Sequence, residues 1–404
     1  MTGSSERVRP SRILPAIVIS QFAGTSLWFA TNAIIPDLRE TWQLGEGAIG
    51  SVTSAVQFGF ITGTLLTAFF TLADRFSPRR IFLLSSLFGA VCNILVLVAP
   101  RAPWSLLALR FLTGIALAGI YPVGMKIASG WYRHGLGSAL GFLVGALVLG
   151  TSFPHLLRGM DYALDWQEVI VAVSLLAASG GILMAVAVPD GPYLTATASF
   201  SLASLPAIFA KKDLRAAAVG YFGHMWELYT FYAFVPVMLT LYAGRHPGTA
   251  IDVSFWSFCI IGAGFFGCSI GGVISRSAGS VRVAAIQLSI SGALCLFSPF
   301  LFDLHESLFL GLMILWGIVV VGDSPQFSAL IAKYAPAGLV GSALTMSNST
   351  GFAITIVSIQ CIGFLSKLIP GSYLLFPLFA GPLIGVFSLF RLRSVEGGRQ
   401  LQTM

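Results

Sequence analysis

The amino-acid sequence predicts an all-helical integral membrane protein in which twelve transmembrane helices form two pseudo-symmetric six-helix bundles. Three observations lead to this fold class: the composition, a series of apolar runs, and a repeat with a period of half the chain. Of the 404 residues, 56% are hydrophobic and 10% are charged, against roughly 25% charged residues in soluble domains. A soluble fold could not cover so much apolar surface, so the chain is expected to reside in a lipid bilayer.

Twelve apolar runs follow one another along the chain, and each can form a helix of the roughly 20 residues that cross a bilayer. They cover residues 13–35, 48–72, 80–99, 103–129, 137–158, 166–188, 214–241, 253–275, 281–302, 307–332, 338–365 and 371–391. Where the connections are short, consecutive helices are expected to be antiparallel neighbours. The long connection at residues 189–213 has the composition of a linker. It separates an N-terminal bundle, 1–188, from a C-terminal bundle, 214–404.

The basic residues lie mainly on one side of this predicted topology. Of 23 lysines and arginines, 17 fall in the termini, the linker and alternate loops, five fall in the other loops, and Arg110 lies within a run. By the positive-inside rule, both termini and the linker are expected to be cytoplasmic, in a protein of the plasma (inner) membrane. Because the basic residues are spread over many loops, nucleic acid is not expected as a partner.

Two segments half a chain apart repeat each other. The fourth run contains GIALAGIYP, from Gly114 to Pro122, and the tenth contains GIVVVGDSP, from Gly317 to Pro325, at an offset of 203. A GSAL sequence follows each segment at an offset of 204, and the first and seventh runs share three residues at an offset of 200. Two parallel six-helix repeats joined by a linker are typical of transporters that work by alternating access.

The loop between the second and third runs carries a charged motif, LADRFSPRR, from Leu72 to Arg80. It resembles the cytoplasmic loop signature G-x-L-A-D-R-x-G-R-R of the major facilitator superfamily, with Asp74, Arg75, Arg79 and Arg80 at matching positions. The first glycine and the inner Gly-Arg pair of the signature are replaced. The resemblance implies that this loop latches the cytoplasmic side while the other side is open. A role only in orienting the chain is the alternative for the arginines.

In the fourth run, Arg110 and Gly114 resemble the R-x-x-x-G motif of the same superfamily. Together with the topology and the repeat, this extends the resemblance over the whole chain and implies a secondary transporter, which we expect to be monomeric. The fifth run lacks the G-P-x-x-G-G motif of drug-exporting antiporters, and the second and eighth runs lack the arginines of nitrate porters. No subfamily is therefore indicated.

Arg110 needs a physical reason to lie inside a bilayer, where a charged side chain costs roughly 2.5–3.5 kcal/mol at mid-span on insertion scales. Thr113, Leu117 and Tyr121 share its helical face, and we include Tyr121 with Arg110 in the predicted substrate site. As a fixed cation, Arg110 could attract a substrate anion. The alternative is a structural ion pair, or a side chain that extends towards the lipid headgroups.

Three further titratable residues lie within predicted helices of the second half, and these are Glu227, His224 and Asp323. A low-dielectric environment disfavours the carboxylate anion, so Glu227 could take up a proton that His224 relays. A Glu–His hydrogen bond that only fixes helix packing is the alternative. Asp323, where the repeat has Ile120, is either a second proton or cation site or a helix-end interaction. We expect Glu227 and Arg110 to flank one cavity and to attract each other until a substrate anion or a proton competes.

Uncharged polar side chains within the runs are further candidates for substrate contacts. These candidates are Gln21, Trp28, Asn32, Gln57 and Asn348. The first three share one face of the first helix. The alternative is that such side chains hold helices together through hydrogen bonds.

The combined features predict a proton-coupled secondary transporter of a small organic or inorganic anion. Proton-driven efflux of amphipathic compounds is the alternative, because the core is rich in aromatic residues. Short loops disfavour a membrane enzyme, the half-chain duplication disfavours a receptor or channel, and no G-x-x-x-x-G-K-[ST] motif indicates a primary pump. The histidines show no ligand spacing and the five cysteines are dispersed through apolar runs. Neither a metal nor another cofactor is therefore expected.

Overall fold

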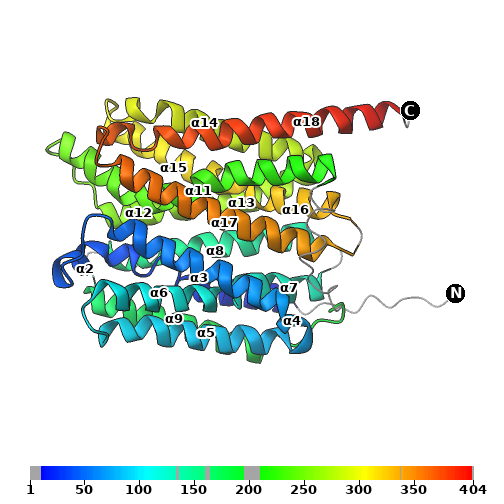
Figure 1. The fold of residues 1–404 in the computed structure, drawn as a ribbon, viewed down its shortest axis with the longest axis horizontal. Coiled ribbons are helices and arrows are strands. Elements are labelled where there is room, and N and C mark those ends of the chain that lie inside the picture. Colours follow the sequence, from blue (N-terminus) through cyan, green and yellow to red (C-terminus); the bar gives the residue numbers. More distant parts are fainter. Residues whose placement is uncertain (1–10, 133–135, 160–163, 195–209, 337, 403–404) are drawn as a thin grey trace.

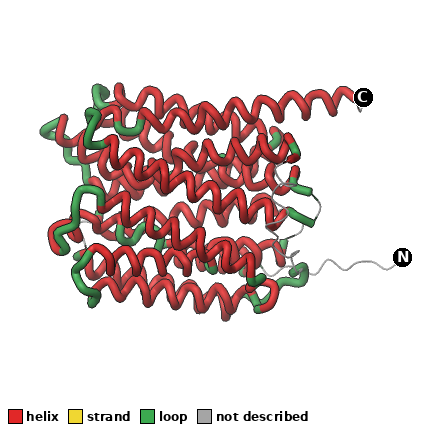
Figure 2. Tube along the Cα trace, viewed as in Figure 1, coloured by secondary structure: helices red, strands yellow, loops and turns green. Residues whose placement is uncertain are grey.

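The computed structural model describes residues 11–132, 136–159, 164–194, 210–336 and 338–402. Throughout these ranges the chain is helical, with turns and short 3₁₀ segments between the helices and no strand (Figure 2). The helices run side by side along the long axis of the molecule (Figure 1). Helices α4, α7 and α16 lie at the same end as the C-terminus of α18, whereas α2 lies at the opposite end (Figure 1). We call these the α4 end and the α2 end.

The first half contributes six spans, of which the first and fourth are divided. In chain order its helices are α1 (Ile13–Thr25), α2 (Ile35–Thr41), α3 (Ala48–Phe69), α4 (Leu72–Arg75), α5 (Pro78–Ile94), α6 (Pro103–Ala118), α7 (Tyr121–Trp131), α8 (Leu136–Arg158) and α9 (Trp166–Ala187). Within this half, α3 packs along α6, and α5 packs along α9.

The second half also forms six spans, of which the second and fourth are divided. Its helices are α11 (Lys212–Arg245), α12 (Val253–Gly262), α13 (Gly264–Ala278), α14 (Ser280–Leu301), α15 (Glu306–Gly322), α16 (Ser324–Tyr334), α17 (Val340–Leu365) and α18 (Ala380–Gln402). The two halves meet where α8 packs against α12 and α13, and where α3 packs against α17. Ten of the described spans are long and apolar enough to cross a membrane, and α1 is a shorter apolar helix.

The repeated sequence segments mark breaks in the fourth and tenth spans. The fourth span divides into α6 and α7 at Gly119 and Ile120, and the tenth divides into α15 and α16 at Asp323. In each case a proline, Pro122 or Pro325, is the second residue of the following helix. Proline has no backbone N–H, so it is tolerated at the start of a helix but not in its interior. The repeat therefore encodes a break at equivalent places in the two halves.

Two glycines of the repeat explain why its sequence is so restricted. A β-carbon on Gly114 would lie 2.1 Å from the backbone oxygen of Val56 in α3, and one on Gly317 would lie 1.8 Å from that of Ile260 in α12. No side chain fits at such distances, so both helix contacts require glycine. The two halves thus use the same close approach between their second and fourth spans, in agreement with the predicted pseudo-symmetry.

The first span is not the continuous helix over residues 13–35 that the apolar run predicted. Helix α1 ends at Thr25, and residues 26–31 form turns before the chain continues towards α2. The hydroxyl groups of Thr25 and Ser26 donate hydrogen bonds to carbonyl oxygens in the last turn of α1, and such side chains compete with regular helical bonding. Irregular backbone at membrane depth is tolerated only where protein or a cavity surrounds it. Protein or a cavity is therefore expected around the break.

Candidate functional site

Arg110 of α6 is fully buried beside the break in the first span. Its Nη2 donates to the carbonyl oxygens of Leu27 and Trp28, both at 2.8 Å, and its Nη1 donates to Asn93 Oδ1 at 3.3 Å. The two carbonyl groups belong to the turn after α1, where regular helical bonding has ended. The guanidinium therefore stabilises the broken segment, and its three acceptors are all uncharged.

The turn after α1 places Trp28 between the two halves. Its ring stacks on Tyr229 of α11 and on Phe352 of α17, with centroid distances of 5.5 and 5.7 Å, and lies 5.0 Å from Phe60 of α3. We call these four residues the aromatic cluster. The indole Nε1 of Trp28 is buried and has no hydrogen-bond partner among the described residues, although a buried tryptophan N–H usually finds one.

Two of the predicted amide side chains are completely buried. Gln21 of α1 and Gln57 of α3 have neither amide atom hydrogen-bonded within the part of the chain that the structure describes. Asn32, in contrast, donates its Nδ2 to Thr53 Oγ1 at 2.7 Å, and Asn348 of α17 is half-buried. An unpaired buried polar group costs about 1–3 kcal/mol. Gln21 and Gln57 are therefore groups that a polar ligand could satisfy.

Glu227 of α11 is fully buried and faces α14. Its Oε2 accepts hydrogen bonds from Ser291 Oγ at 2.9 Å and from Cys295 Sγ at 3.3 Å, while Oε1 has no partner within the described ranges. The sequence placed Glu227 and Arg110 opposite each other, but the hydrogen bonds of each side chain go to helices of its own half. The reason is the helical face on which Glu227 lies, which is turned towards α14.

His224 and Asp323 form a second buried polar contact in the same half. His224 Nδ1 lies 2.8 Å from Asp323 Oδ1, so the two side chains form an ion pair when the imidazole is protonated. Asp323 stands at the break between α15 and α16, and His224 lies one turn from Glu227 on α11. The histidine therefore pairs with Asp323 and not with Glu227, which differs from the Glu–His pair considered above. We call Glu227, His224 and Asp323 the titratable cluster.

Tyr121, the first residue of α7, follows the break in the fourth span. It is half-buried and packs against the hydrophobic core. The next two residues of α7, Pro122 and Val123, line a cavity between the two halves, so Tyr121 lies close to that junction.

The charged loop motif lies at the α4 end. Asp74 forms an ion pair with Lys126 of α7. Arg79 Nε lies 3.9 Å from Oδ2 of Asp190, which follows α9. Arg75 and Arg80 are exposed. The described ion pairs of Asp74 and Arg79 both lie within the first half. They connect the loop to α7 and to the segment after α9 at the α4 end of that bundle.

A cavity of about 150 Å³ opens between the halves beside this loop. Thr64, Asp74 and Lys126 line it from the first half, and Ser342 and Thr345 line it from the second. Thr64 follows Phe60 of the aromatic cluster by one turn of α3. The aromatic cluster therefore lies next to the cavity, about one helical turn further into the molecule. The Asp74–Lys126 pair therefore stands at an opening between the two halves.

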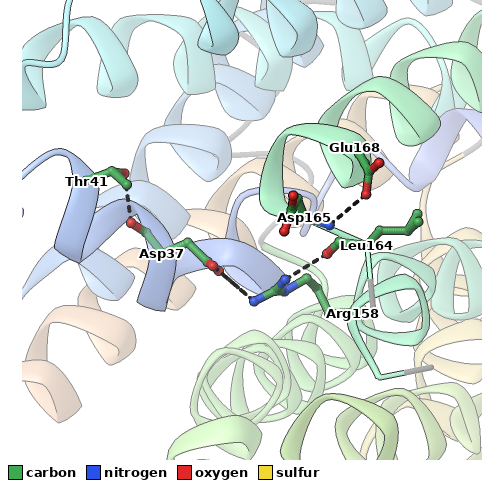
Figure 3. A network of polar contacts seen from close by, with 6 residues as sticks. All are labelled: Asp37, Thr41, Arg158, Leu164, Asp165 and Glu168. Atoms are coloured by element: carbon green, nitrogen blue, oxygen red, sulfur yellow. Dashed lines mark hydrogen bonds and ion pairs between the residues drawn. The ribbon is translucent and has the colours of Figure 1, made fainter. Parts of the chain in front are cut away.

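At the opposite end, a network of polar contacts fastens the first half (Figure 3). Arg158 of α8 donates through Nη2 to both carboxylate oxygens of Asp37 at 3.0 Å, and through Nη1 to the carbonyl oxygen of Leu164 at 2.7 Å. The Glu168 carboxylate accepts from the backbone N–H of Asp165 at 2.9 Å and caps α9. This network joins α2, α8 and the start of α9.

Several residues of these sites were not singled out from the sequence, namely Asn93, Lys126, Ser291 and Cys295. The repeat could have identified two of them, because Asn93 and Cys295 each lie fifteen residues after the start of their helices, α5 and α14. They therefore occupy matching positions, one beside Arg110 and the other beside Glu227. Lys126 was counted only among the basic residues that orient the chain.

Residues 17–359 match the family profile of the Major Facilitator Superfamily. The protein described as "Probable sulfoacetate transporter SauU" of Cupriavidus necator is 24% identical over 390 residues, which cover 88% of this chain and 86% of the relative. The protein described as "Probable galactarate/D-glucarate transporter GudP" of Bacillus subtilis is 28% identical over 181 residues, which cover 42% of this chain and 38% of the relative. The crystal structure of the human organic anion transporter MFSD10 (TETRAN) matches 94% of this chain and 100% of its own, with a TM-score of 0.71 and 16% identity. At that identity the likeness shows the fold.

Proposed function

Because this chain belongs to the major facilitator superfamily and is a multi-pass membrane transporter rather than an enzyme, we propose that it carries a small organic anion by alternating access, coupled to protons. One observation carries the proposal: a buried cation, Arg110, binds the broken segment of the first span, whose Trp28 packs against the second half. Arg110 is the only fully buried lysine or arginine among the residues whose burial is described.

The environment of Arg110 supports an anionic substrate. Its acceptors are two backbone carbonyls and an amide oxygen, so none of these contacts cancels its charge. In a low-dielectric surrounding an uncompensated cation attracts an anion strongly. The unpaired groups of Gln21, Gln57 and Trp28 add polar contacts for such a ligand. The relatives are described as transporters of sulfoacetate and of galactarate and D-glucarate, and the structural neighbour as an organic anion transporter, so all of these solutes belong to the same chemical class.

The titratable cluster supports proton coupling. Glu227 has one carboxylate oxygen bound by Ser291 and Cys295 and one without a partner among the described residues. A serine hydroxyl can donate to a carboxylate or accept from a carboxylic acid, so both protonation states can be accommodated. A buried carboxyl group within a transmembrane helix is typical of proton relays in transporters.

The position of the cavity supports a conformation open at the α4 end. The aromatic cluster separates that cavity from the α2 end, since its rings come from both halves. We place the α4 end in the cytoplasm on the distribution of basic residues, with a monomeric protein in the inner membrane. The bundles then comprise 1–188 and 214–404, and the loop around Asp74 controls their separation.

Transport by purified protein in proteoliposomes tests the proposal. Counterflow of small carboxylates and sulfonates should occur with the natural sequence, and a pH gradient should drive accumulation of the same compounds. Arg110→Ala should abolish both activities, whereas Arg101→Ala, which removes an exposed arginine of the preceding loop, should leave them intact. Counterflow of anions by the Arg110→Ala protein at the rate of the Arg101→Ala control would refute the assignment.

Efflux of amphipathic compounds is a second candidate, favoured by the aromatic cluster. Stacked rings at the junction of the halves would suit a flat apolar ligand. Such a function predicts that uncharged aromatic compounds are transported and that Arg110→Ala affects them little beyond its effect on stability. The same counterflow assay, with an aromatic amide and the corresponding carboxylate, separates the two functions.

A further inference from the structure

We propose that a pocket between the start of α11 and the last part of α18 binds the headgroup of an anionic phospholipid. The pocket has a volume of about 530 Å³ and lies at the α4 end. It is separate from the cavity between the halves and from the buried groups described above, so the proposal does not depend on which solute is transported.

The packing of α11 against α18 creates the pocket. Deeper in the bundle the two helices approach so closely that a β-carbon on Gly223 would lie 2.3 Å from the backbone oxygen of Gly381. Nearer the α4 end, Ser388 Oγ donates to the carbonyl oxygen of Ala216 at 2.6 Å. Beyond this contact the pocket opens beside Lys212 and Arg391. Figure 1 shows α18 extending past its neighbours at this end.

The charge of the lining favours an anion. Three basic side chains, Lys212, Arg215 and Arg391, line the pocket with one acidic residue, Asp213. All three basic residues are exposed, and Lys212 and Arg215 form no ion pair within the described ranges. Basic pockets between transmembrane helices on the cytoplasmic side suit anionic lipid headgroups, and one basic residue near the membrane surface contributes about 1 kcal/mol.

The apolar wall identifies the ligand as a lipid and not as a free phosphate. Ile384 and Phe387 of α18 line the same pocket and are 57% and 64% exposed. They lie one to two turns deeper along the membrane-spanning helix than Arg391. A phospholipid whose phosphate contacts Lys212 and Arg215 would place its acyl chains along these side chains. A soluble phosphate compound would leave this apolar surface uncovered.

Native mass spectrometry of the full-length protein in detergent tests the proposal with defined lipids. The protein is titrated with dioleoyl phosphatidylglycerol, with dioleoyl phosphatidylcholine and with glycerol 3-phosphate. The pocket variant is Lys212→Gln/Arg215→Gln. The matched control is Arg276→Gln/Arg282→Gln, which removes the same charge from two exposed arginines beside the connection of α13 and α14. Equal melting temperatures in phosphatidylcholine establish that both variants are folded.

We expect one phosphatidylglycerol to bind the pocket variant about thirtyfold more weakly than the control, which corresponds to about 2 kcal/mol at 1.4 kcal/mol per factor of ten. Phosphatidylcholine binding should be the same in both proteins. Equal affinity of the two variants for phosphatidylglycerol would overturn the proposal. Displacement of the lipid by glycerol 3-phosphate at the same concentration would also overturn it, because the ligand would then be a soluble phosphate. If the pocket variant does not fold, the phosphatidylglycerol affinities of Arg391→Gln and Arg276→Gln are compared instead, and the same criteria apply.

Discussion

Replacement of Arg110 by alanine should damage the protein in two separable ways. The first is structural, because the guanidinium holds the turn after α1 through the carbonyl oxygens of Leu27 and Trp28. The second is functional, because the substitution removes the buried positive charge to which we assign the anion. Arg110→Lys should separate the two, since it keeps the charge but loses the planar fork that reaches both carbonyls.

The structural loss can be estimated from the bonds. Each of the two buried carbonyl groups that lose their donor costs about 1–3 kcal/mol, so Arg110→Ala should lower the free energy of unfolding by about 2–6 kcal/mol. Asn93 loses a longer bond of 3.3 Å, and it retains its own bonds to Ser174 and to the Ile170 carbonyl in α9. Arg110→Lys should lose less than the alanine variant, because one ammonium group can still donate to one or both carbonyls.

Thermal unfolding of the detergent-solubilised variants measures the first effect, and anion counterflow measures the second. Arg101→Ala serves as the control in both assays. We expect the order of melting temperature to be control, then lysine, then alanine variant. If the Arg110→Ala protein has the same melting temperature as the control but does not bind anions, the guanidinium does not stabilise the broken helix. If both Arg110 variants bind and exchange anions as the control does, the residue is structural and the anion site lies elsewhere.

Four further substitutions test other parts of the mechanism. Glu227→Gln should abolish pH-driven accumulation and keep exchange down a gradient; accumulation by this variant under a pH gradient would make Asp323 the first alternative acceptor. Gly317→Ala should lower the free energy of unfolding by at least about 1–3 kcal/mol, because the added β-carbon would lie 1.8 Å from a backbone oxygen. Gly311→Ala is the control, because Gly311 lies in the same helix with open space around it. The control should have an unchanged or higher melting temperature. Asp74→Asn should slow transport more than it weakens substrate binding, and an equal loss of both would contradict its role at the cavity opening. Tyr229→Ala should uncouple transport from the pH gradient while Tyr229→Phe should not, as read from accumulation ratios.

The apolar runs predicted continuous helices over 103–129 and 307–332 and no break in either, although the repeat contains a signal for both breaks. In the fourth and tenth spans, Pro122 and Pro325 mark the breaks directly, because proline interrupts helical bonding. The break after Thr25 has no proline beside it, and its carbonyl groups accept hydrogen bonds from Arg110 of another helix. Such a break is a tertiary effect, and the local sequence carries only the two hydroxyl side chains of Thr25 and Ser26 as a signal.

The same limit applies to the candidate site. Buried charge identified Arg110, Glu227 and Asp323 as exceptional, since each must find compensation inside the bilayer. What compensates them depends on helix rotation and crossing, which the sequence does not contain. For this reason the side chain of Glu227 faces Ser291 of α14 and does not face Arg110. The roles of these residues in binding and coupling stay predictions that the transport assays decide.

For the proposed proton coupling, the geometry favours a route through α11 in place of a direct attraction between the two charges. Glu227 and Tyr229 lie two residues apart on α11, and Tyr229 stacks on Trp28, whose carbonyl oxygen accepts a bond from Arg110. A change in the bonding of Glu227 to α14 would alter how α11 sits between α14 and the aromatic cluster. Because packed rings have few alternative arrangements, a shift of α11 would reach the turn that Arg110 holds. The stacking of Tyr229 on Trp28 needs the ring and not the hydroxyl group, which is why phenylalanine should preserve coupling and alanine should remove it.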